Sequence, residues 1–391
     1  MRLMLYGIGK GSEYVETCIK KEHSIIGYTD SNSQISLFKG KRFYKIDDII
    51  DVVFDKLIIT IQNRDVANEI LKKLINIGID KEKIIPFFMC AETQMHLIKL
   101  QQRHFQKYEG IILGNSHAKY GLPENAFFHR VINLANPSQD IYYNFLILKE
   151  CLKEYKELFN NLKYVVIDLY DYNVFNIDTS RTKEILHYIN WGGCCSPHNF
   201  EQNKNFTKTF QESLFDEFKM IKNEKIDQEM KELFGKNGTV MYVEDSIWIN
   251  LSKENEKLQQ VIDSKSLINR HKDTIKENIV LLEESIRLIK DFKPECEIIF
   301  TLLPRFLSME EEMSMRIKPW KKEFDIVIKS LIEKYRVYYL DYKNCHEISS
   351  NPEFYYDGGH LNRRGGLCMA SILDGKIKEI LKSRKPNNDL N

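Results

Sequence analysis

Short apolar segments that alternate with helical patterns, in two successive series, constrain the fold of this chain most strongly. The apolar segments of the first series are 3–6, 24–28, 56–61 and 84–86, and those of the second are 110–113, 130–134, 164–169, 297–303 and 337–341. Helical patterns separate most of them, and the long ones lie at 66–77, 142–159, 269–292, 317–334 and 362–381. Because parallel strands need crossover connections, usually helices, this alternation predicts two parallel α/β sheets.

The length of the chain favours two domains, since 391 residues exceed what one hydrophobic core usually holds. We predict a small α/β domain at residues 1–88, a connecting helix at 89–108 and a larger α/β domain at 109–391. A segment rich in Lys, Glu, Asn and Gln, at about 174–268, interrupts the larger domain as a helical insertion. Two interpretations of this insertion are open, a solvated cap or a lid over the functional edge of the sheet.

Composition and charge exclude several classes of protein. The 57 basic and 56 acidic residues nearly cancel, which argues against a nucleic-acid partner bound through bulk charge. No apolar run approaches the roughly 20 residues of a transmembrane helix, and glycines interrupt the apolar N-terminus, unlike a signal peptide. The eight cysteines include no CxxC pair, and there is no HExxH motif, so we expect no metal site. We therefore expect a soluble, cytoplasmic protein.

A glycine-rich turn follows the first apolar segment. Gly7, Gly9 and Gly11 precede a helical pattern, and Asp30 ends the second apolar segment about 20 residues later. Dinucleotide-binding turns have this outline, because glycines let backbone N–H groups approach a phosphate and the acid binds a ribose. Ser12 stands where GxGxxG has its third glycine. Three interpretations remain open: a site for a nucleotide or nucleotide sugar, a redox dinucleotide site, and a purely structural turn.

Two short motifs in the second series carry side chains for nucleophilic chemistry. Gly114-Asn115-Ser116-His117 follows the segment 110–113, and Asp357-Gly358-Gly359-His360 follows the last apolar segment. Both motifs stand just past strand ends, which is where open α/β sheets place their sites. A serine hydroxyl needs a neighbouring base to become a nucleophile, and a histidine base needs a carboxylate to orient it. Alternatively, Ser116 only caps a helix and His360 is an ordinary surface residue.

The order of these motifs resembles that of the SGNH (GDSL-like) hydrolase superfamily over about residues 110–382. The resemblance implies a flavodoxin-like, three-layer α/β/α domain with a five-stranded parallel sheet. It makes Ser116 the nucleophile, His360 the general base and Asp357 its orienting partner. Asn115, where the family more often has Asp, becomes a substrate-binding candidate. The first domain similarly resembles the small Rossmann-like modules attached to sugar-modifying enzymes of bacterial surface-glycan pathways.

The middle motifs of the family are altered in this chain. The family's glycine after the second strand, an oxyanion donor, is absent, and backbone N–H groups of Ala135, Asn136 or Ser138 are its candidate replacements. The family's G-x-N-D pattern after the third strand aligns its asparagine with Tyr172, and Asn173 follows. The candidate oxyanion residues are therefore Asn136, Tyr172 and Asn173.

The substrate predictions rest on Arg305 and on the resemblance. Arg305 follows the fourth segment of the second series, where it binds an anionic part of a substrate or forms a surface ion pair. The resemblance implies an O-acyl (acetyl) transferase or esterase acting on a surface-polysaccharide or nucleotide-sugar intermediate, with a small molecule or glycan as substrate. It implies no tightly bound cofactor, and acyl-CoA is the candidate donor. The alternatives are a non-catalytic carbohydrate-binding or scaffold protein and a sugar-nucleotide oxidoreductase using the first domain.

The glycine turn generates a binding prediction. We expect a nucleotide sugar to bind the first domain more tightly than NAD(H) or NADP(H), because the turn presents N–H groups to phosphates. Gly9→Val should abolish this binding, since its side chain blocks the approaching phosphate. Isothermal titration calorimetry measures both. Tight binding of NAD(P)H would instead support the oxidoreductase alternative.

Overall fold

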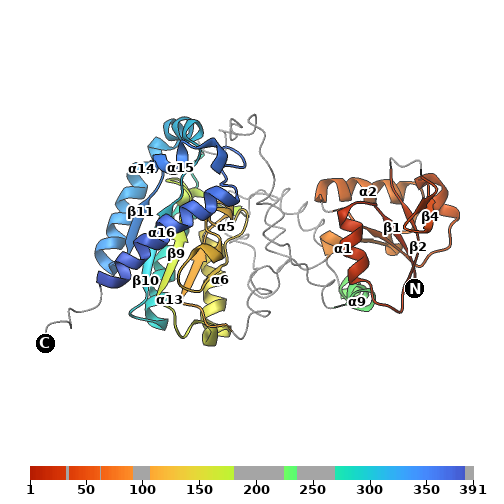
Figure 1. Ribbon diagram of the computed structural model, residues 1–391, viewed down its shortest axis with the longest axis horizontal. Helices are drawn as coiled ribbons and strands as arrows, with labels where there is room; N and C mark the ends of the chain where they lie inside the picture. Colours follow the sequence, from red (N-terminus) through yellow and green to blue (C-terminus); the bar gives the residue numbers. More distant parts are fainter. Residues whose placement is uncertain (32–34, 62, 91–105, 180–223, 236–268, 384–391) are drawn as a thin grey trace. The chain divides into compact units, whose positions relative to one another are not determined.

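The computed structural model describes residues 1–31, 35–61, 63–90, 106–179, 224–235 and 269–383 (Figure 1). The chain divides into two compact units. The first contains Met1–Ile98 and Lys208–Tyr242, and the second contains Lys99–Thr207 and Val243–Asn391. Both units are built on sheets of mainly parallel strands with helices, so the predicted α/β fold class is confirmed. No helix within the described residues is both long and apolar enough to cross a membrane.

The described part of the first unit forms a six-stranded sheet in the order β3-β4-β2-β1-β5-β6. The strands are β1 (Arg2–Tyr6), β2 (Ser24–Thr29), β3 (Leu37–Phe38), β4 (Lys41–Tyr44), β5 (Lys56–Ile59) and β6 (Ile84–Pro86). The helices beside them are α1 (Lys10–Cys18), α2 (Arg64–Asn76) and α3 (Phe87–Cys90). Only β3 runs antiparallel to its neighbour among these strands. The parallel strands, counted along the chain, have the order 3-2-1-4-5 of doubly wound nucleotide-binding folds.

Helix α9 (Glu224–Leu233) completes the core of the first unit, although it lies between β9 and α13 in the sequence. Phe234 is buried, and its ring meets that of Phe87 edge-on at 4.8 Å between centroids. The backbone N–H of Lys20 donates to the carbonyl of Leu233 at 3.0 Å. Glu229 pairs with Lys56 at 2.7 Å. The first unit is therefore discontinuous in sequence.

This packing differs from the domain organisation expected for the insertion. We assigned all of 174–268 to the larger domain. Its residues 174–179 do belong to the second unit, whereas residues 224–235 belong to the first. The sequence shows that α9 is amphipathic, but periodicity alone does not show which sheet receives the apolar face. Residues 180–223 and 236–268 of the insertion, and most of the expected connecting helix at 89–108, lie outside the described residues.

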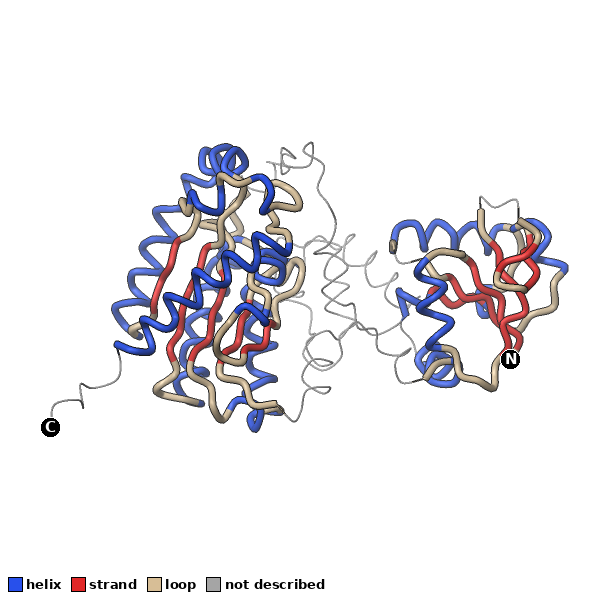
Figure 2. The backbone as a smooth tube through the Cα atoms, viewed as in Figure 1, coloured by secondary structure: helices blue, strands red, loops and turns tan. Residues whose placement is uncertain are grey.

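The described part of the second unit contains the predicted five-stranded parallel sheet, in the order β11-β10-β9-β7-β8. Its strands are β7 (Gly110–Leu113), β8 (Val131–Asn133), β9 (Tyr164–Asp168), β10 (Glu297–Leu302) and β11 (Tyr338–Asp341). Counted along the chain, this is the flavodoxin-like order 2-1-3-4-5. Figure 2 shows helices on both sides of the sheet.

The helices of the second unit fall into two packed groups. Helices α6 (Ile141–Glu154) and α13 (Lys272–Phe292) pack together, and α14 (Leu307–Tyr335) contacts both α13 and β11. Helix α16 (Arg363–Ser383) packs instead with the short helix α5 (Ser116–Gly121) and with α15 (His346–Ser349). All five strands are parallel, so the loops after β7, β8, β9, β10 and β11 meet at the carboxyl edge of the sheet.

The packing of α9 predicts a large effect of Phe234→Ala on the first unit. Removing a buried aromatic ring should lower its free energy of unfolding by about 3–5 kcal/mol. Urea titration, with limited proteolysis to report the first unit separately, measures this loss. The matched control is Phe128→Ala, because Phe128 is 74% exposed in the second unit. Equal effects of the two substitutions would contradict the assignment of α9 to this core.

Candidate active site

The turn after β7 is sterically restricted to glycine at its first position. Gly114 has φ +147°, and a Cβ there would lie 2.8 Å from Ala118 Cβ and 2.9 Å from Asp168 Cβ. The Asn115 side chain then accepts the backbone N–H of His117 at 2.9 Å and caps α5. Ser116 is the first residue of this helix. The turn therefore holds the serine at the carboxyl edge. Asn115, which we named as a substrate-binding candidate, uses its side-chain oxygen as a helix cap.

Ser116, His360 and Asp357 form a continuous hydrogen-bonded relay. Ser116 Oγ lies 2.8 Å from His360 Nε2, and His360 Nδ1 lies 2.9 Å from Asp357 Oδ2. A carboxylate can only accept, so Nδ1 carries the proton and Nε2 is left to accept from the serine hydroxyl. The structure thus brings together the three residues predicted as a triad, across 244 positions of sequence.

The turn before His360 fixes the Asp357 carboxylate. Its Oδ1 accepts the backbone N–H groups of Gly359 at 2.8 Å and His360 at 2.7 Å. Burial alone would raise the pKa of this carboxyl, but His360 and the two N–H groups outweigh burial and hold the pKa below its usual value. The side chains of His360 and Asp357 are 29% and 23% exposed, so water can reach both of them.

Arg305 is not free to hold a substrate in the way that we proposed as one alternative. Its side chain is buried and pairs with Asp171 through Nη2 and with Glu310 at 3.0 Å through Nη1. Lys343, also buried, lies 3.1 Å from both carboxylates. The ion-pair interpretation fits better, although the pair is internal and not at the surface. These four side chains, which we call the charge cluster, join the loops after β9, β10 and β11 to α14.

The candidate oxyanion side chains make other contacts. The amide of Asn136 donates to Gln139 at 3.3 Å, and its backbone N–H donates to the Gly114 carbonyl at 3.3 Å. The Tyr172 hydroxyl donates to Asp341 at 3.0 Å. Asn173 is buried, and its side-chain oxygen has no hydrogen-bond partner among the described residues. No contact found in the described residues joins any of these three side chains to the triad.

Two residues at the same edge of the sheet have a positive φ that we did not predict from the sequence. Ser138, after β8, has φ +57°, and Tyr170, after β9, has φ +63°. Both are in the left-handed region that favours glycine, and non-glycine residues held there often mark functional loops. The altered middle motifs contain the signal, because Tyr170 occupies the glycine position of the G-x-N-D alignment. A tyrosine at this position gives no sign in the sequence that its φ is positive.

The glycine turn of the first unit has structural reasons for two of its three glycines. Gly7 has φ +108°, and a Cβ on Gly11 would lie 2.1 Å from the Thr60 carbonyl oxygen. Gly9, which precedes α1, has no atom within 4 Å of such a Cβ. Gly9→Val is therefore compatible with the protein itself, and loss of binding in this variant would report on a ligand. Nucleotide binding by this turn and Asp30 stays a prediction.

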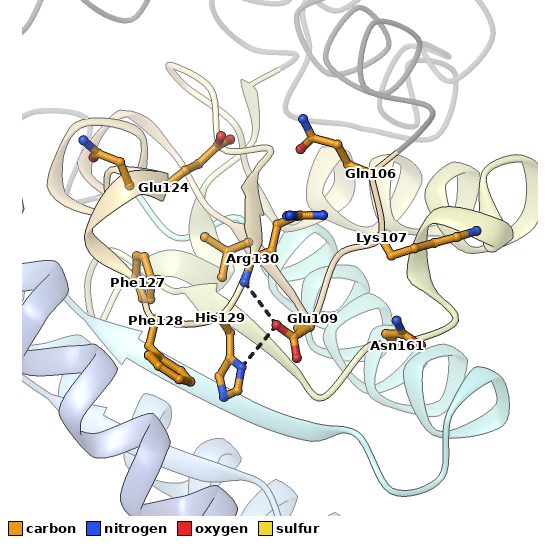
Figure 3. Close-up of a pocket in the computed structure, with 11 residues that line it drawn as sticks. Gln106, Lys107, Glu109, Glu124, Phe127, Phe128, His129, Arg130 and Asn161 are labelled. Carbon is orange, nitrogen blue, oxygen red and sulfur yellow. Dashed lines mark hydrogen bonds and ion pairs between the residues drawn. The ribbon is translucent and has the colours of Figure 1, made fainter.

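A separate hollow of about 650 Å³ lies at the opposite edge of the second sheet (Figure 3). Its residues include Glu109, His129 and Arg130, which precede β7 and β8. Glu109 accepts the backbone N–H of Arg130 and pairs with His129, as the dashed lines show. This hollow is therefore distinct from the triad.

Within the described residues, no group of three or more His, Cys, Asp or Glu side chains could hold a metal ion.

Comparisons with known proteins give one partial family match and distant structural similarities. Residues 1–85 match a family described as C2185-like, N-terminal. This corrects the family attribution that we made for the first unit; its strand order is shared by many families, so topology does not identify one. No curated protein matches the sequence.

The solved structures similar to this chain include lipases and acylhydrolases. A GDSL-like lipase from Bacteroides thetaiotaomicron is 12% identical, with a TM-score of 0.32, and the match covers 73% of this chain and 96% of that one. A lipase/acylhydrolase from Enterococcus faecalis is 14% identical, with a TM-score of 0.30 and coverage of 72% and 99%. Phospholipase A1 from Streptomyces albidoflavus is 10% identical, with a TM-score of 0.29 and coverage of 68% and 98%. Similarity at this level carries no conclusion about activity.

Asp168 makes the stability of the second unit depend on pH. It ends β9 beneath Gly114, and burial raises the pKa of its carboxyl to about 7, although Thr301 Oγ1 donates to it at 3.1 Å. In the unfolded chain an aspartate has a pKa of about 3.9. Between these values the folded state holds a proton that the unfolded state has lost, so stability falls as pH rises.

We expect Asp168→Asn to remove this pH dependence. The slope contributed by one such group is up to about 1.4 kcal/mol per pH unit between roughly pH 4 and 7. Urea unfolding at several pH values compares the variant with the wild type. Asp325→Asn, at a half-exposed surface pair with Lys321, is the control and should keep the wild-type slope. An unchanged slope in Asp168→Asn would show that Asp168 titrates normally.

Proposed function

We propose that the protein catalyses serine-dependent acyl transfer or ester hydrolysis at Ser116. The observation that carries the proposal is the hydrogen-bonded relay from Ser116 Oγ through His360 to Asp357. A serine that only capped α5 would need no histidine on its hydroxyl, and in fact Asn115 caps this helix. A surface histidine would need no carboxylate oriented by two backbone N–H groups. A helix-capping serine and a surface histidine therefore do not explain the Ser116–His360 and His360–Asp357 hydrogen bonds. Nucleophilic chemistry requires both of these bonds.

The proposed reaction proceeds in two steps. His360 Nε2 takes the proton of Ser116 Oγ as the oxygen attacks the ester carbonyl, and the same proton then goes to the leaving alkoxide or thiolate. An acyl-serine forms at this point. Water or a sugar hydroxyl next loses its proton to His360 and attacks the acyl carbonyl. His360 returns this proton to Ser116 Oγ as the serine leaves, which restores the free enzyme. Asp357 keeps the imidazole in the required tautomer and stabilises its charged form.

Two backbone groups are the proposed donors to the oxyanion. The N–H groups of Ala135 and Asn136 are already bonded to Asn133 Oδ1 and the Gly114 carbonyl. The backbone–backbone bonds found among the described residues include none from the N–H groups of Ser116 and Ser138. Ser138 is one of the three residues whose N–H we named as a replacement for the family's glycine. Donors of this kind stabilise the charge that develops on the carbonyl oxygen.

The finer substrate class is part of the proposal. An O-acetyl ester on a carbohydrate, with acyl-CoA as donor if the reaction is a transfer, is the first class to test. The resemblance of the second unit to acyl-modifying members of its superfamily supports this choice. A second candidate is a carbohydrate-binding protein that has lost catalysis, which the engagement of Asn136 and Tyr172 in other hydrogen bonds favours.

Labelling with a serine-directed fluorophosphonate tests the proposed nucleophile. We expect one adduct on the peptide containing Ser116, and none in Ser116→Ala. Ser371→Ala, at an exposed serine of α16, is the matched control and should label like the wild type. Hydrolysis of an activated acetyl ester without labelling of Ser116 would refute the proposal. Sugar binding with neither labelling nor hydrolysis would favour the non-catalytic alternative.

Substitution of the other two triad members tests their roles. His360→Ala and Asp357→Asn should each lower kcat by about 10³- to 10⁴-fold, since the base and its orienting carboxylate act as a unit. Steady-state hydrolysis of an activated acetyl ester measures the loss. His129→Ala is the control, because His129 lies at the opposite edge of the sheet and pairs with Glu109. A His360→Ala variant with near-normal kcat would exclude His360 as the base.

A further inference from the structure

His117 places a second imidazole directly against the proposed catalytic base. The rings of His117 and His360 are stacked, with centroids 4.5 Å apart and an interplanar angle of 27°. His117 is buried, and its ring also limits Gly359, where a Cβ would lie 3.2 Å from the His117 Cε1 atom. The ring therefore forms the wall behind the turn that holds Asp357 and His360. The relay itself uses no atom of this side chain.

The ring of Tyr170 packs against that of His117, and the backbone of Tyr170 has an unfavourable positive φ. Its ring centroid lies 4.5 Å from that of His117, and the Arg305 guanidinium stands 4.8 Å from the Tyr170 ring centre. The φ of +63° at Tyr170 is one that a bulky residue rarely adopts. Such strain persists where the surroundings over-determine it, and here Asp171, the next residue, is bound within the charge cluster.

Electrostatics keep the imidazole of His117 neutral. Burial lowers its pKa well below the usual range, and the neighbouring His360, Arg305 and Lys343 lower it further. A neutral ring can face the imidazolium that His360 becomes during the reaction without repelling it, and an aromatic face attracts a cation. A charged neighbour at the same distance would oppose proton transfer from Ser116.

We propose that His117 and Tyr170, anchored through Arg305, form a ring column that positions His360 for proton transfer. The inference rests on the proposed function and deepens it by assigning positioning residues. His360 must satisfy Ser116 and Asp357 with two nitrogens of one ring. Tyr120 meets this partly exposed ring only edge-on, at 5.9 Å between centroids, which leaves its faces to be held by other contacts. The stacked face of His117 restricts the tilt of this ring. His117 and Tyr170 contact neither substrate nor the transferred proton in this role.

Variants that remove or retain the rings test the column. His117→Ala should lower kcat by about 100-fold, the order of loss that small misplacements of a reacting group cause, with KM unchanged. His117→Phe keeps a flat neutral ring and should restore most of kcat with the same pH-rate midpoint. Tyr170→Gly removes the second ring while relieving the backbone, because glycine adopts positive φ freely. It should also lower kcat, and it covers the case in which His117→Ala does not fold.

A spectroscopic readout separates this inference from the proposed function. In the wild type, proton NMR should show a protected Nδ1–H signal from His360 bonded to Asp357. The signal should persist in His117→Phe and exchange rapidly in Tyr170→Gly and His117→Ala. His129→Ala should leave both the signal and kcat unchanged.

The outcomes are distinct. Wild-type signal and kcat in both ring-deleted variants would overturn the ring column. Loss of activity in His117→Phe together with loss of the pH-dependent ionisation would make His117 itself a base, and would also overturn it. A wild type without esterase activity or Ser116 labelling refutes the proposed function alone, and the NMR signal then still decides whether the column positions His360.

Discussion

The hydrogen bond between Ser116 and His360 depends on the way parallel strands end together. Ser116 follows β7, the second strand from one edge of the sheet, and His360 comes after β11, the strand at the other edge. The two residues meet only because all five strands run in the same direction and deliver their loops to one edge. Gly114 permits the sharp turn on one side, and two backbone N–H groups fix the Asp357 turn on the other. The parallel direction of the five strands is therefore what allows Ser116 and His360 to meet.

Beneath this partly exposed relay lies an unusually charged interior. Arg305, Lys343, Asp171 and Glu310 are all buried and neutralise each other in pairs. Removing one member of such a group leaves an uncompensated buried charge, which is strongly destabilising. The cluster therefore holds the loops after three strands firmly together. Rigid support of this kind is what a reacting group held within a fraction of an ångström requires.

Much of the fold could be read from the sequence because its signals are local. Apolar segments such as 110–113 and 164–169 became β7 and β9 with nearly the same bounds, and the Ser116 motif follows β7 directly as expected. The His360 motif does not stand just past β11, because α15 and a 3-10 helix at Pro352–Phe354 come between them. The hairpin of β3 and β4 was missed, since its short, charged sequence lacks an apolar run. Features that depend on contacts between distant parts of the chain could not be predicted from the sequence either. The docking of α9, the pairing of Arg305 and the positive φ at Tyr170 depend on tertiary contacts that no short pattern encodes.

Trapping the covalent intermediate tests the central claim most directly. Wild-type protein is mixed with an activated acetyl ester, quenched in acid during turnover, digested and mapped by mass spectrometry. The proposed mechanism predicts a single acetyl group on the peptide that contains Ser116, and its absence in Ser116→Ala. Turnover with acetylation only at another residue, or with Ser116 unmodified at every quench time and undiminished turnover in Ser116→Ala, would contradict it.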